Sequence, residues 1–298
     1  MVIAYIDVAG YQDILYKRGE YELFADIHMM IQTAGLMKLQ SDGKDVKVKF
    51  LTDSGIIYFE DNEDDQSNSI LNGLIIAIGK FQFIALTKCN LMIRGGITTG
   101  YLYDEEFIFG NGYLKALKLE QDVADYQRIV VDDLLLNRLI PPLRENMIYN
   151  CYDDKKMIDY ISCEIGPDPN ESDAHKVLEQ HERSLGILGS EALKNTLDSL
   201  VDQIAKGINP RISEFIQFQK INERYSHVLE YHLKTCDKYN YHSKSDNPTG
   251  DINIKQSYDE LINSIKDYDS NDMRLNESIE HLKAEYKRTM KFIKTGKA

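Results

Sequence analysis

The sequence predicts an α+β fold, in which a sheet carries helices on one face and is followed by a C-terminal helical extension. Three observations support this prediction. Short β-type runs alternate with helical periodicity in residues 1–165, helical periodicity dominates residues 166–298, and the turn-rich stretch Gly166–Asn170 separates the two parts. We therefore predict one domain over residues 1–165 and a helical region for packing, dimerisation or regulation over residues 166–298.

The first elements follow from the spacing of apolar residues. Val2–Ile6 is a short apolar run that leads to Asp7 and Gly10, as expected for a buried strand that ends at a polar turn. Apolar residues then recur at the period of a helix: Leu23, Ile27, Met30, Ala34 and Met37. Two β-type runs on either side of Thr52–Gly55 predict a hairpin.

Later segments extend the same pattern to the end of the first part. We predict a second helix over residues 70–86, a strand over residues 91–97 and a helical stretch from about residue 110 to 124. A further strand is predicted at residues 128–131, and residues 152–162 can supply a last one.

Beyond the turn-rich stretch, the apolar pattern is almost wholly helical. Stripes occur within residues 193–204 and 215–225, and residues 243–250 form a polar segment that predicts a loop. The last predicted helix, residues 275–293, has near-heptad spacing and a basic end. This seam can pack on its own domain or on another subunit, and the sequence leaves both alternatives open.

The charge balance argues against polynucleotide partners. The 298 residues include 35 basic and 48 acidic side chains, a net charge of −13, whereas affinity for a phosphate backbone depends on Lys and Arg. The acidic stretch Asp61–Asp65 predicts a solvated loop.

The sequence also indicates a soluble, cytoplasmic protein with no direct membrane insertion. The N-terminal apolar run meets Asp7 too early for a signal peptide, and no apolar run approaches the roughly 20 residues that span a bilayer. The cysteines show no CxxC pairing, which predicts buried, reduced thiols and neither a zinc site nor a disulfide framework: Cys89, Cys151, Cys163 and Cys236.

Two carboxylates form the sharpest candidate site. If the strand before Asp7 and the hairpin with Asp53 are neighbours, both side chains project from one edge of the sheet, where their charges repel unless a cation lies between them. Mg²⁺ and Mn²⁺ favour a few carboxylate oxygens and complete their shell with substrate phosphates. The alternative is that Asp7 caps the following turn and Asp53 is an ordinary turn residue.

Four segments resemble class III nucleotidyl cyclases, in the correct order over about residues 1–135. Tyr5–Tyr11 resembles the first metal-binding strand and phosphate turn, and Lys49–Ser54 resembles the hairpin with the second metal aspartate. Arg94–Gly100 resembles the central strand and its glycine turn. Phe109–Asn111, with Ala116 and Glu120 further on, resembles the helix of the transition-state residues. The resemblance implies a ferredoxin-like βαββαβ core.

The resemblance also implies a homodimer with two shared active sites. One subunit would bind two Mn²⁺ or Mg²⁺ ions through Asp7, the carbonyl of Val8 and Asp53, while the other contacts the base and the reacting phosphate. The 3′-hydroxyl of a nucleoside triphosphate would attack the α-phosphate and release pyrophosphate. The turn at Gly10 and Tyr11 would offer backbone N–H groups to the phosphates, although the ring of Tyr11 suits packing as well.

Several positions depart from the typical family pattern. Lys49 stands where adenylate cyclases place a base-reading lysine, but Phe107 replaces the aspartate that accepts from adenine. Leu114 replaces the transition-state asparagine and Lys118 the arginine, with Lys115 nearby to share the role.

These departures resemble the pyrimidine cyclases of bacterial Pycsar anti-phage systems, which make cyclic UMP or cyclic CMP for a separate effector protein. UTP is the favoured substrate and CTP the alternative. Two other hypotheses remain: a catalytically silent cyclase-like domain that binds a nucleotide or a partner, and an adenylate or guanylate cyclase. Arg94 can contact a phosphate or the base, or form a structural ion pair, and Lys49 can read a base or lie on a solvated strand face.

Overall fold

The computed structural model describes residues 1–41, 46–124, 126–167, 170–185, 227–228 and 230–241. Contacts divide the chain into two compact units, Met1–Val177 and Leu178–Ala298. The helical stripes predicted within residues 193–204 and 215–225, the helix predicted over 275–293 and the loop predicted at 243–250 lie outside the described residues. The helical extension from residue 166 therefore stays a prediction.

The first unit contains the strands β1 (Val2–Val8), β2 (Lys47–Leu51), β3 (Ser54–Phe59), β4 (Ile93–Thr99), β5 (Tyr103–Asp104), β6 (Ile108–Phe109), β7 (Ile129–Val131), β8 (Ile148–Asn150) and β9 (Lys156–Ile158). Its helices are α1 (Tyr11–Arg18), α2 (Glu20–Thr33), α3 (Leu36–Ser41), α4 (Asp65–Cys89), α5 (Asn111–Lys118), the π-helical turn η1 (Leu119–Val123), α6 (Asp133–Leu136), α7 (Pro141–Asn146) and α8 (Tyr160–Ile165).

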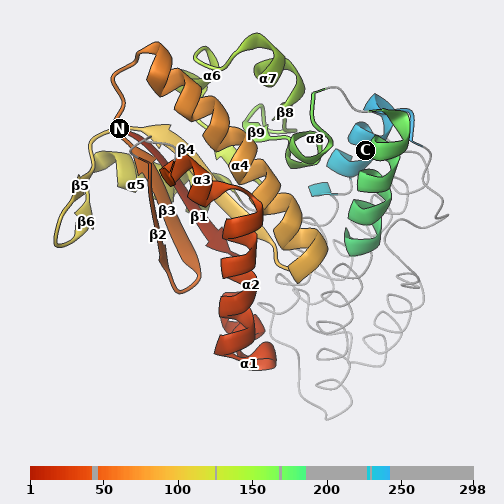
Figure 1. Cartoon of the computed structure of the whole chain (residues 1–298), viewed down its shortest axis with the longest axis horizontal. Helices are drawn as coiled ribbons and strands as arrows, with labels where there is room; N and C mark the ends of the chain where they lie inside the picture. Colours follow the sequence, from red (N-terminus) through yellow and green to blue (C-terminus); the bar gives the residue numbers. More distant parts are fainter. Residues whose placement is uncertain (42–45, 125, 168–169, 186–226, 229, 242–298) are drawn as a thin grey trace, which may run out of the picture. The chain divides into compact units, whose positions relative to one another are not determined.

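Seven strands form one mixed sheet in the order β2-β3-β1-β4-β7-β9-β8, while β5 and β6 form a separate hairpin. The first strand β1 is antiparallel to both β3 and β4, and β4 is parallel to β7. Up to β4 the elements follow a βαββαβ order, and β1 lies between β3 and β4 (Figure 1). The α+β class predicted from the sequence is therefore confirmed.

The main core lies on one face of this sheet. Successive residues of a strand point to opposite faces, and the even-numbered residues of β1 pack with α2 and α4. On α2 the buried residues are those that the helical period predicts: Leu23, Ile27 and Met30. The predicted stripe ends at Gly35, whose φ of 79° starts a new helix, and Met37 is therefore exposed on α3.

The opposite face carries α5, so the prediction that all helices cover one face is wrong. Ile3 of β1 forms a smaller cluster on that side with Ala116 of α5. Two glycines allow the close approach: a Cβ on Gly96 would lie 2.3 Å from the Cβ of Leu119, and one on Gly112 would lie 2.3 Å from Cδ1 of Ile3. The central strands are apolar on both faces. The sequence pattern of β1 does not distinguish such a strand from one that has a single apolar face.

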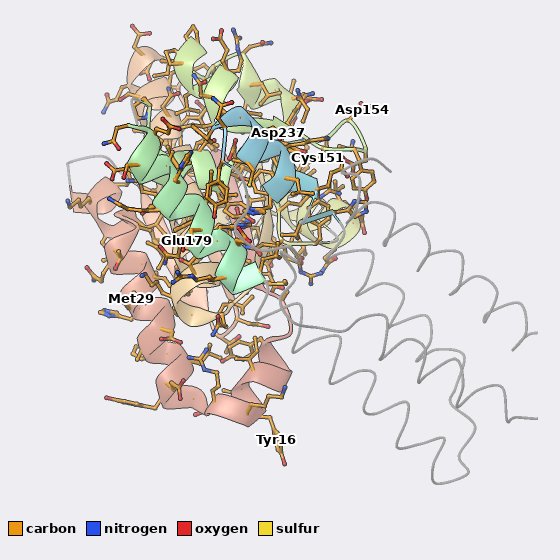
Figure 2. The ribbon with its side chains drawn as sticks, turned by 90° about the vertical axis from the view of Figure 1, so that its right-hand side faces the viewer. Tyr16, Met29, Cys151, Asp154, Glu179 and Asp237 are labelled. Atoms are coloured by element: carbon orange, nitrogen blue, oxygen red, sulfur yellow. The ribbon has the colours of Figure 1, made fainter. Side chains whose placement is uncertain are left out.

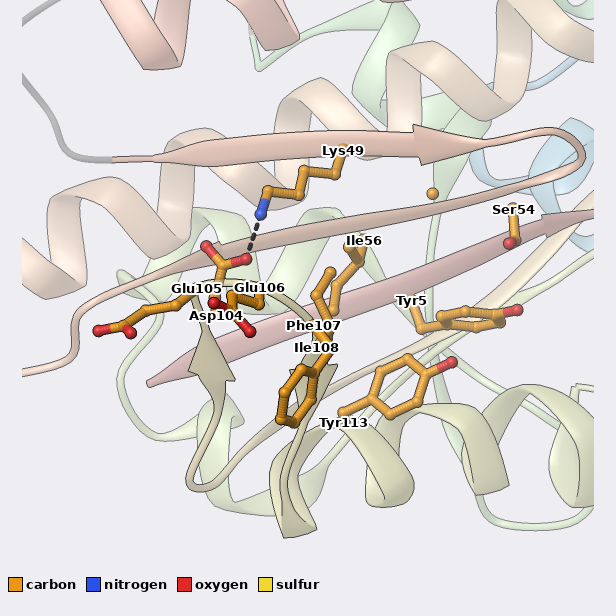
Figure 3. A pocket seen from close by; sticks show the side chains of 11 residues that line it. Tyr5, Lys49, Ser54, Ile56, Asp104, Glu105, Glu106, Phe107, Ile108 and Tyr113 are labelled. Atoms are coloured by element: carbon orange, nitrogen blue, oxygen red, sulfur yellow. Dashed lines mark hydrogen bonds and ion pairs between the residues drawn. The ribbon is translucent and has the colours of Figure 1, made fainter.

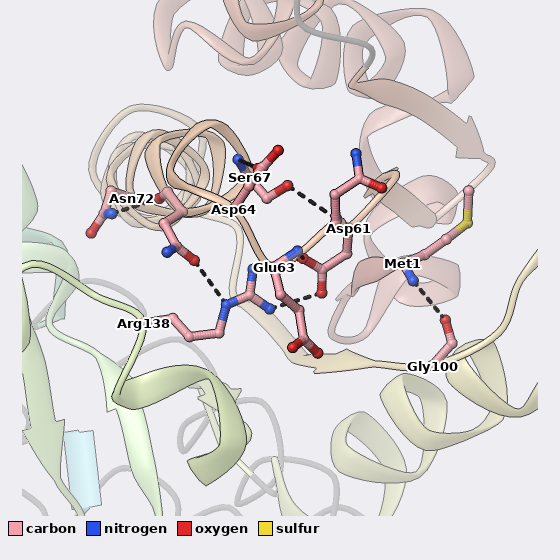
Figure 4. A network of polar contacts seen from close by, with 10 residues as sticks. Met1, Asp61, Glu63, Asp64, Ser67, Asn72, Gly100 and Arg138 are labelled. Carbon is pink, nitrogen blue, oxygen red and sulfur yellow. Dashed lines mark hydrogen bonds and ion pairs between the residues drawn. The ribbon is translucent and has the colours of Figure 1, made fainter.

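The 25-residue helix α4 is anchored at its N-terminal end. The side chain of Asp64 caps the helix by accepting from the backbone N–H of Ser67 at 2.7 Å. Arg138 donates to both carboxylate oxygens of Asp61, at 2.8 and 2.6 Å, and to Asn68 at 2.9 Å (Figure 4). Asp61 is thus buried in an ion pair, which corrects the prediction of a wholly solvated acidic loop.

By length and composition alone, α4 is apolar enough to cross a membrane, contrary to the expectation that no such segment exists. Most of its apolar stretch is buried inside the protein. Packing against the sheet and against α8 accounts for this apolar composition. All four cysteines are free and buried, as predicted.

The first unit also exposes aromatic and sulfur-containing side chains. Tyr16 of α1 is 94% exposed, and Met29 of α2 is exposed as well; Figure 2 shows both pointing away from the helices that carry them.

In the second unit, residues 178–185 and 230–238 are helical. His181 and His232 are fully buried there, with their Nδ1 atoms 2.9 Å apart, and Sγ of Cys236 lies 3.4 Å from Nε2 of His232. Such a short contact joins two neutral imidazoles, of which one donates and the other accepts.

Candidate functional site

The structure brings Asp7 and Asp53 to the same end of the sheet. Asp7 pairs with Ser54 across β1 and β3, and the backbone N–H of Val8 donates to the carbonyl oxygen of Asp53 at 2.9 Å. Asp53 lies in the short turn between β2 and β3, where Thr52 adopts a positive φ of 54°. The two acids are 46 positions apart in the sequence, but they lie at the same end of the sheet because β1 and β3 are hydrogen-bonded neighbours.

Arg94 is the direct partner of Asp7. The two residues face each other across β1 and β4, and Nε and Nη2 of Arg94 each donate to Oδ2 of Asp7 at 3.3 Å. Burial raises the pKa of Asp7, Arg94 opposes this rise, and the charge of Asp53 adds to it. The sequence leaves two roles open for Arg94, contact with a phosphate or base and a structural ion pair, and the structure shows the ion pair.

A third acid, Glu120, completes this cluster and was not predicted as a site residue. It is 2% exposed, and its Oε1 lies 2.7 Å from Nε of Arg94. Burial raises the pKa of Glu120, while the charge of Arg94 lowers it. The period of four from Gly112 through Ala116 to Glu120 was the available signal, because it places all three on the sheet-facing side of α5 and η1.

A pocket of about 370 Å³ lies on the same face of the sheet, further from the turn that holds Asp53. Its walls include Tyr5 and Tyr113, whose rings meet edge to face with centroids 5.9 Å apart. Figure 3 shows Lys49 reaching from β2 toward Asp104 at the mouth of this pocket. Ser54 also lines it, so the pocket adjoins the residue that pairs with Asp7.

Asp104 is the second site residue that sequence reasoning missed. Its side chain is 7% exposed, accepts hydrogen bonds from Lys49 and Tyr58, and lies 3.5 Å from Nζ of Lys47. Hydrogen bonds from Lys49 and Tyr58 lower the pKa of Asp104, so the carboxylate stays ionised and acts only as an acceptor. Asp104 thus places a carboxylate acceptor beside Lys49, on β5 and three residues before Phe107 in the chain.

Phe107 lies on the hairpin of β5 and β6 and lines the pocket, yet it is 60% exposed. Its ring centroid lies 5.6 Å from that of Tyr103 and 5.5 Å from that of Phe109. Of these three rings, Phe107 is the one that lines the pocket.

The remaining predicted residues do not join the acid cluster of their own chain. Leu114 is 55% exposed, and Lys115 and Lys118 are exposed beside it on the side of α5 that faces away from the sheet. Gly10 has a left-handed φ of 74° where α1 begins, and Tyr11 packs against the main core.

Among the described residues, no group of three or more His, Cys, Asp or Glu side chains is arranged to hold a metal ion. Asp7 and Asp53 remain a pair of carboxylates at one edge, which suits a divalent ion that takes its other ligands from backbone oxygen, water and phosphate. No protein-family model matches the chain, and comparison with curated proteins finds no match.

Proposed function

We propose that the protein is a homodimeric, metal-dependent pyrimidine nucleotide cyclase of the class III type. It would convert UTP, or alternatively CTP, into the 3′,5′-cyclic monophosphate and pyrophosphate in the cytoplasm, as a signal for a separate effector protein in anti-phage defence. One observation carries the proposal: Asp7 of β1 and Asp53, in the turn before the neighbouring strand β3, lie at one end of a sheet that also holds a pocket with a paired lysine and carboxylate.

The metal site would consist of Asp7, Asp53 and the carbonyl of Val8. Two Mg²⁺ or Mn²⁺ ions would supply neutralisation of the triphosphate and a lowered pKa for the attacking 3′-hydroxyl. The chain itself contributes the opposed charges that hold this position: the two acids attract cations, and Arg94 keeps a positive charge on the same face. Gly10 permits the turn whose backbone N–H groups would face the phosphates.

The pocket is proposed to hold the base. Lys49 is a donor and Asp104 an acceptor, a pair that complements O4 and N3–H of uracil. Cytosine and adenine offer a ring nitrogen beside an amino group, which the same pair can bind in the opposite sense. The pair of Lys49 and Asp104 therefore also suits adenine, and an adenylate cyclase is the second candidate function.

The exposed face of α5 supports a shared site. Lys115 and Lys118 point away from the sheet of their own chain, so they can assist the reacting phosphate only if that phosphate is held by a second copy. In the proposed dimer, the acids of one protomer would meet the pocket and α5 of its partner. Both lysines are point charges without the planar fork of arginine.

The test is to incubate the full-length protein with each of the four ribonucleoside triphosphates and Mn²⁺, and to separate the products by chromatography. We expect cyclic UMP or cyclic CMP, and none when EDTA replaces Mn²⁺. Cyclic AMP alone would establish the second candidate instead. If no triphosphate gives a cyclic product, the chain is the catalytically silent alternative.

A further inference from the structure

Arg94 lies between two carboxylates, Asp7 and Glu120, and binds Asp7 at the long end of the hydrogen-bond range. Both of its donations to Oδ2 of Asp7 measure 3.3 Å, whereas charge-assisted bonds of this kind are usually about 2.7–2.9 Å. The same Nε lies only 2.7 Å from Oε1 of Glu120. The guanidinium therefore donates hydrogen bonds to Asp7, but its shorter contact is with Glu120.

In this arrangement, one carboxylate oxygen of Glu120 lacks a hydrogen bond from the described residues. Its Oε1 is buried and accepts no hydrogen bond in the described part of the chain, although Arg94 is within ion-pair distance. A buried carboxylate oxygen that accepts no hydrogen bond is less stable than one that does. Glu120 also lies in a π-helical turn, a rare geometry that is frequent at functional sites. The cluster thus favours a second arrangement in which Arg94 donates to Glu120.

We propose that Glu120 is a positioning residue that acts through Arg94, by accepting the guanidinium when Asp7 is given up to a divalent cation. The inference rests on the proposed function, since it requires Asp7 as a metal ligand. Without Glu120, Arg94 has Asp7 as its one ion-pair partner in this cluster and competes with the cation for it. With Glu120, Asp7 is released while the positive charge stays on the sheet face.

The test measures binding of Mn²⁺ alone to the full-length protein, from the loss of the free-ion electron paramagnetic resonance signal. Glu120→Gln keeps the side-chain volume and removes the charge, and it should weaken Mn²⁺ binding roughly tenfold, as changes to residues behind a metal ligand commonly do. The matched control is Asp122→Asn, which removes an exposed acid from the same turn and should leave the affinity nearly unchanged.

The Arg94→Gln variant separates a positioning role from a simple charge effect. Removing the competitor should tighten Mn²⁺ binding, and adding Glu120→Gln to that variant should change it no further. The proposal would be overturned if Glu120→Gln weakened Mn²⁺ binding equally in the wild-type and Arg94→Gln backgrounds. It would also be overturned if Glu120→Gln alone left the affinity unchanged, or if Arg94→Gln alone weakened Mn²⁺ binding. Thermal melting checks that each variant is folded. If the wild-type protein binds no Mn²⁺, that result contradicts both this inference and the metal site of the proposed function.

Discussion

Asp7 and Asp53 are the two residues on which the proposed chemistry depends most. They lie at one edge because β1 is hydrogen-bonded to β3, and their charges act on each other, since Asp53 contributes to the raised pKa of Asp7. The two carboxylates repel each other, and a bound cation would relieve this repulsion. The pair of like charges therefore favours the binding of a cation.

Asp7→Ala and Asp53→Ala should each abolish turnover of the triphosphate while the protein stays folded and dimeric. Each change removes one of the two proposed carboxylate ligands and leaves the apolar core intact. Product formation and sedimentation velocity measure the two effects. Asp133→Asn, an exposed acid on α6, is the control and should behave as wild type. Near-normal activity in either alanine variant would contradict the assigned role.

At this scale, the local pattern of strand and turn predicts Asp7 and Asp53, whereas Lys49 is predicted only by the resemblance to the cyclase family. The sequence does not predict Asp104 or Glu120 as site residues. Asp104 meets Lys49 across 55 positions of the chain, and Glu120 is buried only because η1 packs onto β4. The helical period can place Glu120 on the sheet-facing side of η1, but both contacts are tertiary, so no local pattern marks the contact of Glu120 with Arg94 or that of Asp104 with Lys49.

The elements of the first unit follow the predicted order, and their differences from prediction have local causes. The segment at residues 152–162 was predicted as one strand, but it contains the short strand β9 and the start of α8. Asp159 ends the strand by capping α8, where it accepts from the backbone N–H of Ser162 at 2.9 Å.

The packing of α4 predicts opposite effects for two glycine substitutions in that helix. A Cβ on Gly79 would lie 2.5 Å from Sγ of Cys163, whereas one on Gly73 would meet only the end of the flexible Leu39 side chain at 3.1 Å. Alanine favours a helix over glycine by about 1 kcal/mol, but overpacking costs about 1–3 kcal/mol. Gly73→Ala should therefore raise the free energy of unfolding, and Gly79→Ala should lower it.

Urea unfolding of the two variants beside the wild type checks this prediction. The pair is matched, because both positions lie within the same helix and receive the same substitution. Equal shifts of the unfolding midpoint would show that contact with α8 does not limit the spacing of α4.

For the whole molecule, the net charge of −13 requires local cations wherever a triphosphate binds. In the proposed dimer these are the metal ions, Arg94 and the exposed lysines of α5. A shared site makes a specific prediction for mixed dimers. A dimer of one Asp53→Ala protomer and one Lys118→Ala protomer, purified through two different tags, should retain about half of the wild-type activity, because one of its two sites is intact.

The two parent variants, each as a homodimer, are the controls and should both be inactive. If mixed dimers are as inactive as their parents, the acids and Lys118 belong to the same protomer's site, and the shared arrangement is wrong.

The second unit makes the stability of the molecule sensitive to acid. Burial lowers the pKa of His232 to about 4 from 6.5, so the folded state keeps it neutral while the unfolded state binds a proton below pH 6.5. The stability due to this group is complete above pH 6.5 and falls as the pH decreases toward 4, by about 3 kcal/mol in all. His181, also buried, has its pKa lowered and acts in the same direction.

Melting temperatures at pH 7, 6 and 5 measure this effect. His232→Gln should flatten the decrease on the acid side, and the exposed His28→Gln should keep the wild-type slope. An identical slope in all three proteins would show that the buried imidazole pair does not control the acid response.

The central claim is that this chain cyclises a pyrimidine nucleoside triphosphate. The most direct measurement is the stoichiometry of the two products from UTP or CTP with Mn²⁺, with the cyclic nucleotide quantified by mass spectrometry and pyrophosphate by a coupled assay. Our account predicts equal amounts of 3′,5′-cyclic monophosphate and pyrophosphate from the wild type, and neither from Asp7→Ala. Release of a linear monophosphate, or the absence of any cyclic product from either substrate, would contradict it.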